Sequence, residues 1–120
     1  MRDFELAKAL QDRADEILYF DNYSDEKQRQ LAFENLCNHA LSLNKANIAY
    51  LFSRDVGNFL DDKYRKAFDV AKFEDVVIKG GDEELIYMFG RDIEGANLKK
   101  IISKLSSSLA KKELGDEHSF

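Results

Sequence analysis

The sequence contains no proline and no tryptophan, and it has one cysteine and two histidines among 120 residues. Average composition would give about six prolines in such a chain, and without them the fixed-φ turns common in β-sandwiches are missing. Cys37 cannot form an internal disulfide, and a cysteine-based zinc site needs several further ligands. No apolar run approaches the roughly 18 residues of a membrane-spanning helix. These absences favour long helices, a reducing compartment and a cytoplasmic location.

Hydrophobic residues make up 44% of the chain and aromatic residues 12%, which is enough to build a core. We therefore expect one folded domain over residues 1–114 and a frayed tail over 115–120. The net charge of −5 disfavours broad binding to nucleic acid or to an anionic membrane, because both attract lysine and arginine. A basic protein is the expected partner.

The charge is unevenly distributed along the sequence. Residues 98–112 carry five lysines and no acid, and residues 113–120 carry three acids, which leaves −7 for residues 1–97. Lysines in a last helix complement its dipole and give the end of the molecule a polar face, and the alternative is a weak anion-binding patch. The five are Lys99, Lys100, Lys104, Lys111 and Lys112.

Apolar residues recur three and four positions apart, the spacing of amphipathic helices. This pattern predicts helices over 4–20, 25–42, 45–56, 60–69 and 83–93, and a last helix from 98 that includes Leu109. Residues 73–78 contain three consecutive β-branched residues, but no partner strand is evident, so a helix is predicted there as well. Ser24, Asn44, Asp82 and Asn97 are the expected N-caps, and Gly57 is the expected left-handed stop.

An internal repeat is the most informative feature of the sequence. Residues 48–56, IAYLFSRDV, match residues 85–93, LIYMFGRDI, at an offset of 37. Four of the nine positions are identical, and three more exchange one apolar residue for another. A helix followed by a second amphipathic segment, present twice, indicates helical hairpins that stack to share a core. Phe52 and Phe89 are then equivalent core residues, and residues 4–42 form a diverged first hairpin or cap.

Residues 87–101, YMFGRDIEGANLKKI, resemble a tandem repeat of uncharacterised bacterial proteins. In that family a helix ending Tyr-x-Phe-Ala-Arg-Asp-Val leads through Gly-Ala-Asn into a second helix. The resemblance covers residues 82–105 well and 45–56 in part, and Gly57-Asn58-Phe59 departs from it. It implies an all-α fold of six to seven helices, a short right-handed stack of hairpins like a HEAT α-solenoid. It implies no activity.

The repeated Arg-Asp pairs, Arg54-Asp55 and Arg91-Asp92, are interpreted as structural. Each arginine follows a tyrosine by four residues and can lie against its ring, while the aspartate can bond to the backbone of a neighbouring repeat.

The sequence contains few candidate catalytic or metal-binding residues. Cys37 and His39 are two residues apart, which turns their side chains away from each other on a helix. Cys37 is expected to be a buried, small apolar residue. The spacings typical of zinc and calcium sites are absent. We therefore predict no catalytic residues, no metal and no cofactor, and we do not expect an enzyme.

The predicted function is inhibition by binding. In size and charge the chain resembles bacterial immunity proteins, which neutralise nuclease toxins, and carboxylates of residues 1–97 could imitate nucleic-acid phosphates in a basic cleft. The predicted partner-binding residues are Tyr50, Asp61, Asp62, Asp82, Glu83, Glu84 and Tyr87. Such an inhibitor is expected to stay monomeric until it is bound. The alternatives are a scaffold protein that forms homodimers, and an acidic nucleic-acid mimic that acts on a defence complex.

Overall fold

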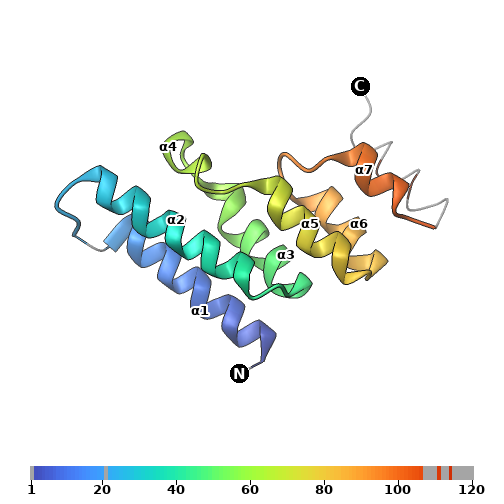
Figure 1. Ribbon diagram of the computed structural model, residues 1–120, viewed down its shortest axis with the longest axis horizontal. Helices are drawn as coiled ribbons and strands as arrows, with labels where there is room; N and C mark the ends of the chain where they lie inside the picture. The colour runs from blue at the N-terminus through green and yellow to red at the C-terminus, as the bar shows by residue number, and fades with distance from the viewer. Residues whose placement is uncertain (1, 21, 107–110, 112–113, 115–120) are drawn as a thin grey trace.

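A computed structural model describes residues 2–20, 22–106, 111 and 114 (Figure 1). Within these residues the chain is helical and has no strand, which confirms the predicted all-α class of six to seven helices. The elements in chain order are α1 (Asp3–Asp15), the π-helix η1 (Glu16–Phe20), α2 (Glu26–Ser42), α3 (Ala46–Asp55), the 3₁₀-helix η2 (Gly57–Phe59), α4 (Asp62–Arg65), α5 (Val70–Gly80), α6 (Glu83–Asp92) and α7 (Leu98–Ser103).

The helices pair along the chain and follow one another along the long axis of a flat molecule (Figure 1). The extents along the principal axes are 51 × 36 × 17 Å. Helix α3 packs against α1 on one side and α6 on the other, and α2 contacts α5. These contacts arrange α1, α3 and α6 in one layer, with α2 and α5 in a second. The right-handed stacking and the likeness to a HEAT solenoid stay predictions.

The sequence repeat corresponds to a repeat of structure. Helices α3 and α6 begin and end 37 residues apart, in agreement with the offset of the sequence match. The second helices of the two hairpins also correspond: Asp69 and Asn97 each accept a bond from the backbone N–H three residues on, and Phe73 and Ile101 are each fully buried one position later. This second offset is 28, so the connection after α3 is nine residues longer and contains η2 and α4.

The first hairpin differs from the prediction at its turn. Helix α1 ends at Asp15 and continues to Phe20 as a π-helix, in which Ile17 is buried. The N-cap of α2 is Asp25, not Ser24, because the Asp25 carboxylate accepts a 2.8 Å bond from the backbone N–H of Gln28. The N-cap of α3 is Lys45, not Asn44, which has a positive φ of 51°.

The predicted left-handed stop at Gly57 is wrong. Among the described glycines, positive φ occurs at Gly81 (77°) and Gly95 (88°). Gly57 is required for space instead, since a Cβ on it would lie 2.5 Å from the ring of Phe68. The predicted helix over 60–69 is reduced to the single turn α4, because the chain turns after it to bring Phe68 into the core.

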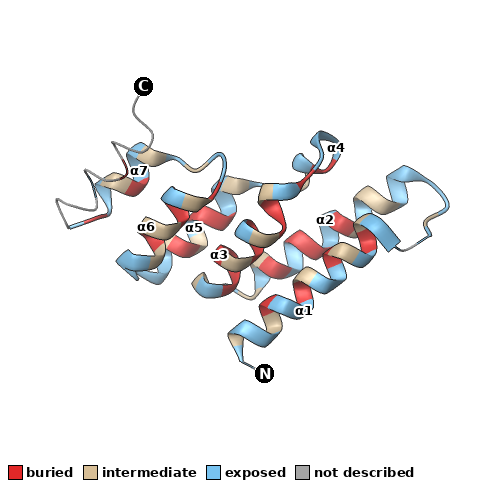
Figure 2. Cartoon of the chain, turned by 180° about the vertical axis from the view of Figure 1, so that it is seen from behind, coloured by how far each residue is buried: buried red, intermediate tan, exposed pale blue. Residues whose placement is uncertain are grey.

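Buried side chains form one cluster that runs through all three hairpins (Figure 2). Its largest fully buried members are Phe33, Phe52, Phe73 and Phe89, so the prediction of Phe52 and Phe89 as core residues is confirmed. Helix α5 spans the ambiguous stretch 73–78, and Val77 from that stretch is fully buried.

The last described helix, α7, ends at Ser103, earlier than the sequence pattern predicts. Leu109 and the predicted tail 115–120 lie outside the described residues. The extent of the domain therefore stays a prediction.

Candidate functional site

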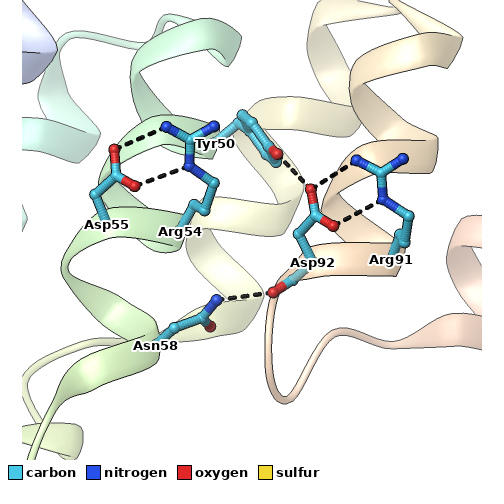
Figure 3. Close-up of polar contacts among 6 residues, drawn as sticks. All are labelled: Tyr50, Arg54, Asp55, Asn58, Arg91 and Asp92. Carbon is cyan, nitrogen blue, oxygen red and sulfur yellow. Dashed lines mark hydrogen bonds and ion pairs between the residues drawn. The ribbon is translucent and has the colours of Figure 1, made fainter.

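The repeated motif forms the same local arrangement twice, once in α3 and once in α6 (Figure 3). Arg54 donates to both carboxylate oxygens of Asp55 at 2.8 and 3.1 Å, and Arg91 donates to both of Asp92 at 2.7 and 3.0 Å. Each guanidinium lies over the tyrosine one turn earlier, 5.6 Å from the ring centre of Tyr50 and 5.5 Å from that of Tyr87. The ring packing predicted from the spacing is confirmed.

Asp92 also joins the two repeats. Its carboxylate accepts a 2.5 Å hydrogen bond from the hydroxyl of Tyr50, and its backbone carbonyl accepts a 2.7 Å bond from Asn58 (Figure 3). The Asn58 side chain accepts in turn from the backbone N–H of Glu94 at 3.0 Å. The prediction that the aspartate side chain bonds to the neighbouring backbone is therefore wrong: the Asp92 carboxylate bonds to the Tyr50 hydroxyl, and Asn58 makes the bonds to the backbone.

These hydrogen bonds determine the protonation states of Tyr50 and Asp92. The hydrogen bonds from Arg91 hold the pKa of Asp92 below its ordinary value, and the bond from Tyr50 acts in the same direction. Burial raises the pKa of Tyr50, and the nearby Asp92 carboxylate raises it further. At neutral pH the pair is therefore a neutral hydroxyl that donates to a charged carboxylate.

The two tyrosines differ in access to solvent. Tyr50 is only 3% exposed, so it lacks the partial exposure on which its predicted role as an anchor depends: its ring is part of the core and its hydroxyl already has an acceptor. Tyr87 is half-buried and its ring lies beside Arg91.

The five predicted acidic residues lie in two separate places. Asp61 and Asp62 are at the start of α4, close in sequence to the Asn58 bridge to the C-terminal end of α6. Asp82, Glu83 and Glu84 are at the N-terminal end of α6. A helix of ten residues is about 15 Å long, so the structure does not bring the two groups together.

Three of these acids have partners within the fold. The Asp82 carboxylate caps α6 by accepting from the backbone N–H groups of Glu84 (3.0 Å) and Leu85 (3.4 Å), as predicted. Glu83 accepts from the backbone N–H of Ser106 at 2.5 Å and from its hydroxyl at 2.9 Å. Asp62 lies 3.6 Å from Arg65.

Asp61 and Glu84 are different. Both are exposed, and neither carboxylate forms an ion pair or a hydrogen bond with any described residue. They are the two predicted residues whose charge the described part of the fold leaves uncompensated.

A groove of about 370 Å³ lies between η1, the start of α2 and α4, with Asp61 on its wall. Its floor is a polar cluster around Glu26, which accepts a hydrogen bond from the Tyr64 hydroxyl and lies 3.7 Å from Lys63 and 3.9 Å from Arg29. Arg29 also donates to the carbonyl of Ile17 in the π-helix at 2.6 Å. The sequence pattern did not reveal this groove, because it depends on how η1 and α4 meet.

The residues considered for catalysis lie apart from these features. Cys37 is fully buried, as predicted, and burial raises the pKa of its thiol to about 12. His39 is exposed on α2. Within the described ranges no three His, Cys, Asp or Glu side chains are placed to hold a metal ion, and no helix there has the length and apolar character that crossing a membrane demands.

Comparison with protein-family models, with curated proteins and with solved structures finds no match to this chain.

Proposed function

We propose that this chain is a non-catalytic inhibitor that binds a basic protein, of the kind that bacterial immunity proteins represent. The partner is a nuclease toxin whose nucleic-acid cleft is lined by lysine and arginine. The chain covers that cleft and so blocks the entry of substrate. Its place of action is the cytoplasm.

The observation that carries the proposal is the state of Asp61 and Glu84. Both are exposed and neither is paired with a described cation. A carboxylate that already has an internal ion pair must give it up to bind a partner, whereas an unpaired one loses only its water. These two residues therefore offer the most favourable contacts for lysine or arginine.

The excess of negative charge over residues 1–97 supports the same conclusion. The summed field of an acidic surface draws a basic partner toward it and raises the association rate by about tenfold or more at low salt. Such a mechanism requires no catalytic group and no cofactor.

Charge reversal tests the proposal against a panel of purified bacterial nuclease-toxin domains. The unmodified chain should bind a basic member and inhibit its cleavage of nucleic acid. The double variant Asp61→Lys/Glu84→Lys should slow association about tenfold or more and flatten its dependence on salt. This pair is preferable to Asp82 or Glu83, whose removal also disturbs the fold.

The matched control is Lys99→Glu/Lys104→Glu, which leaves the Lys100–Asp75 pair in place. It should bind the toxin as well as the unmodified chain, or better. Loss of binding in this control, with none in the acidic double variant, would contradict the proposal. A chain that dimerises at micromolar concentration and binds no basic domain would instead support the scaffold alternative.

A further inference from the structure

A second groove crosses the layer formed by α1, α3 and α6. It has a volume of about 250 Å³, and its apolar wall consists of Phe4, Leu51, Leu85 and Met88. A smaller hollow of about 40 Å³ continues it along α1 and shares Phe4 and Leu51. We name the two together the α1–α3–α6 groove.

Phe4 is exceptional in this groove because it is 72% exposed although it is a large apolar side chain. Contact with a partner would remove this apolar surface from water, which favours binding. Leu51, Leu85 and Met88 are half-buried beside it, so the apolar surface extends over three helices. Leu51 and Met88 occupy equivalent positions of the repeat, 37 residues apart.

The spacing of these side chains selects the shape of an occupant. Phe4, Leu51 and Met88 line this groove and come from three neighbouring helices, one residue from each, and we call them the apolar row. Neighbouring packed helices lie about 8–10 Å apart. Residues seven apart on an α-helix are separated by about 10.5 Å along its axis and lie on nearly the same face. Same-face residues on an extended strand repeat every 6.6–7 Å or so, which is shorter than the distance between neighbouring helices.

The charged residues beside the groove indicate the charge of the segment that binds there. Glu84 lies one turn before Met88 on the same face of α6, and it has no ion pair with any described residue. Two cations line the groove, and both are already paired: Arg54 makes two bonds to Asp55, and Lys8 lies 2.5 Å from Asp12. Asp3, also on the wall, is held by Lys45 at 3.0 Å. The uncompensated charge beside the apolar row is therefore negative.

We infer that the α1–α3–α6 groove binds an amphipathic, basic α-helix of the partner protein. The helix lies across α1, α3 and α6, with apolar residues seven apart on Phe4, Leu51 and Met88. Lysine or arginine beside this stripe meets Glu84. The inference rests on the proposed function for the basic character of the partner and adds which face is used and which element it receives.

The larger groove beside η1 is less suited to this role. Asp61 on its wall has no described partner, but Glu26 already has the Tyr64 hydroxyl and two cations as neighbours, so a basic side chain that binds Glu26 competes with existing pairs. It serves as the alternative location in the test.

The test begins with selection from a library of random 18-residue peptides displayed on phage, with the whole chain as bait. The expected consensus has apolar residues seven apart with lysine or arginine between them. An acidic consensus, a consensus without this period, or no enrichment overturns the inference. Shift changes in an NMR titration with the best peptide should be centred on Leu51, Leu85 and Met88, and changes centred on Tyr19 and Asp61 also overturn it.

Two exposed phenylalanines give a matched pair of variants. Phe4 and Phe59 are both 72% exposed, but Phe59 lies in η2 and does not line the groove. Phe4→Ser should weaken binding of the selected peptide about tenfold, whereas Phe59→Ser should leave the dissociation constant unchanged. Equal effects of the two variants contradict the inference. Because both side chains are exposed, neither change is expected to unfold the chain.

The outcomes separate this inference from the proposed function. If a peptide binds in the groove but the chain inhibits no nuclease, the groove inference holds and the inhibitor proposal is wrong. Inhibition of a nuclease that is insensitive to Phe4→Ser leaves the inhibitor proposal standing and the groove assignment wrong. Self-association that Phe4→Ser abolishes shows that a second copy of the chain is the occupant, and this too overturns the inference.

Discussion

The hydroxyl of Tyr50 in α3 donates a hydrogen bond to the carboxylate of Asp92 in α6, across the boundary between the two repeats (Figure 3). Asp92 is at the same time held by two nitrogens of its own Arg91. The Tyr50–Asp92 bond therefore joins the two units side chain to side chain, beside the Asn58 bonds to the backbone of Asp92 and Glu94.

Removing this hydroxyl should destabilise the fold. Tyr50→Phe leaves the ring in place but takes one hydrogen bond from a charged, largely buried carboxylate, which costs about 1.5–3 kcal/mol. Urea denaturation measures the free energy of unfolding. A double-mutant cycle with Asp92→Asn should show coupling between the two positions, and Asp55→Asn in place of Asp92→Asn should show a smaller coupling. A loss below about 0.5 kcal/mol for Tyr50→Phe would falsify the structural importance of the link.

The two equivalent phenylalanines should both be essential, but not to the same degree. Phe52→Ala and Phe89→Ala should each cost about 3–5 kcal/mol, since both side chains are buried. Phe52 additionally stacks on Phe73 with ring centres 5.5 Å apart, so its loss should be the larger. Thermal melting followed by circular dichroism gives the comparison, and a variant that melts within two degrees or so of the parent contradicts the equivalence.

A side chain at position 57 should destabilise the fold. In Gly57→Ala the new methyl group would clash with the Phe68 ring. That ring cannot easily move away, because its centre lies 4.6 Å from the ring centre of Phe73. Overpacking of this kind costs about 1–3 kcal/mol of stability. Truncating the ring should relieve the clash, so Gly57→Ala should cost less in a Phe68→Leu background. Additive losses in the urea denaturation of the double variant would show that the ring is not the cause.

Glu74 should give the stability a distinctive dependence on pH. Its carboxylate is 2% exposed and accepts a 2.7 Å bond from the backbone N–H of Asn97. Burial raises its pKa above the ordinary 4.5, against the opposing effects of the Asn97 bond and Lys100, and Asp75 raises it further. The folded state therefore holds this proton more tightly than the unfolded chain does. The resulting stabilisation is complete below about pH 4.5 and is lost as the pH rises through the folded pKa.

In Glu74→Gln the amide oxygen can still accept from Asn97, and the titration is absent. The stability of the natural chain minus that of the variant should therefore fall as the pH rises from 4 to 7, as measured by urea denaturation at each pH. A difference that stays flat or rises with pH contradicts the assignment.

Sequence patterns predicted the features that depend on neighbours along the chain. The three-four spacing located the helices, and the side chains of Asp82 and Asn97 cap α6 and α7 as expected. The Tyr-Arg spacing gave the ring packing of Arg54 and Arg91, because residues four apart in a helix always meet.

Features that depend on which helices become neighbours were not predictable in this way. Tyr50 has the same local sequence context as Tyr87, yet it is buried because α6 packs beside it. The need for glycine at position 57 arises from Phe68, eleven residues away, and the α1–α3–α6 groove requires α1, α3 and α6 to lie side by side. A periodic pattern identifies the face that is buried, but it does not identify what covers that face.

The link from Tyr50 to Asp92 has a direction: the earlier unit supplies the donor and the later unit the acceptor. Helix α1 contains no tyrosine, so it has no equivalent of Tyr50 to donate to Asp55 of α3. A copy of residues 46–82 inserted before Glu83 would carry an aspartate for the unit before it and a tyrosine for the unit after it. Each repeat therefore has an acceptor for the repeat before it and a donor for the repeat after it, so the same hydrogen bond could join further repeats inserted between α5 and α6.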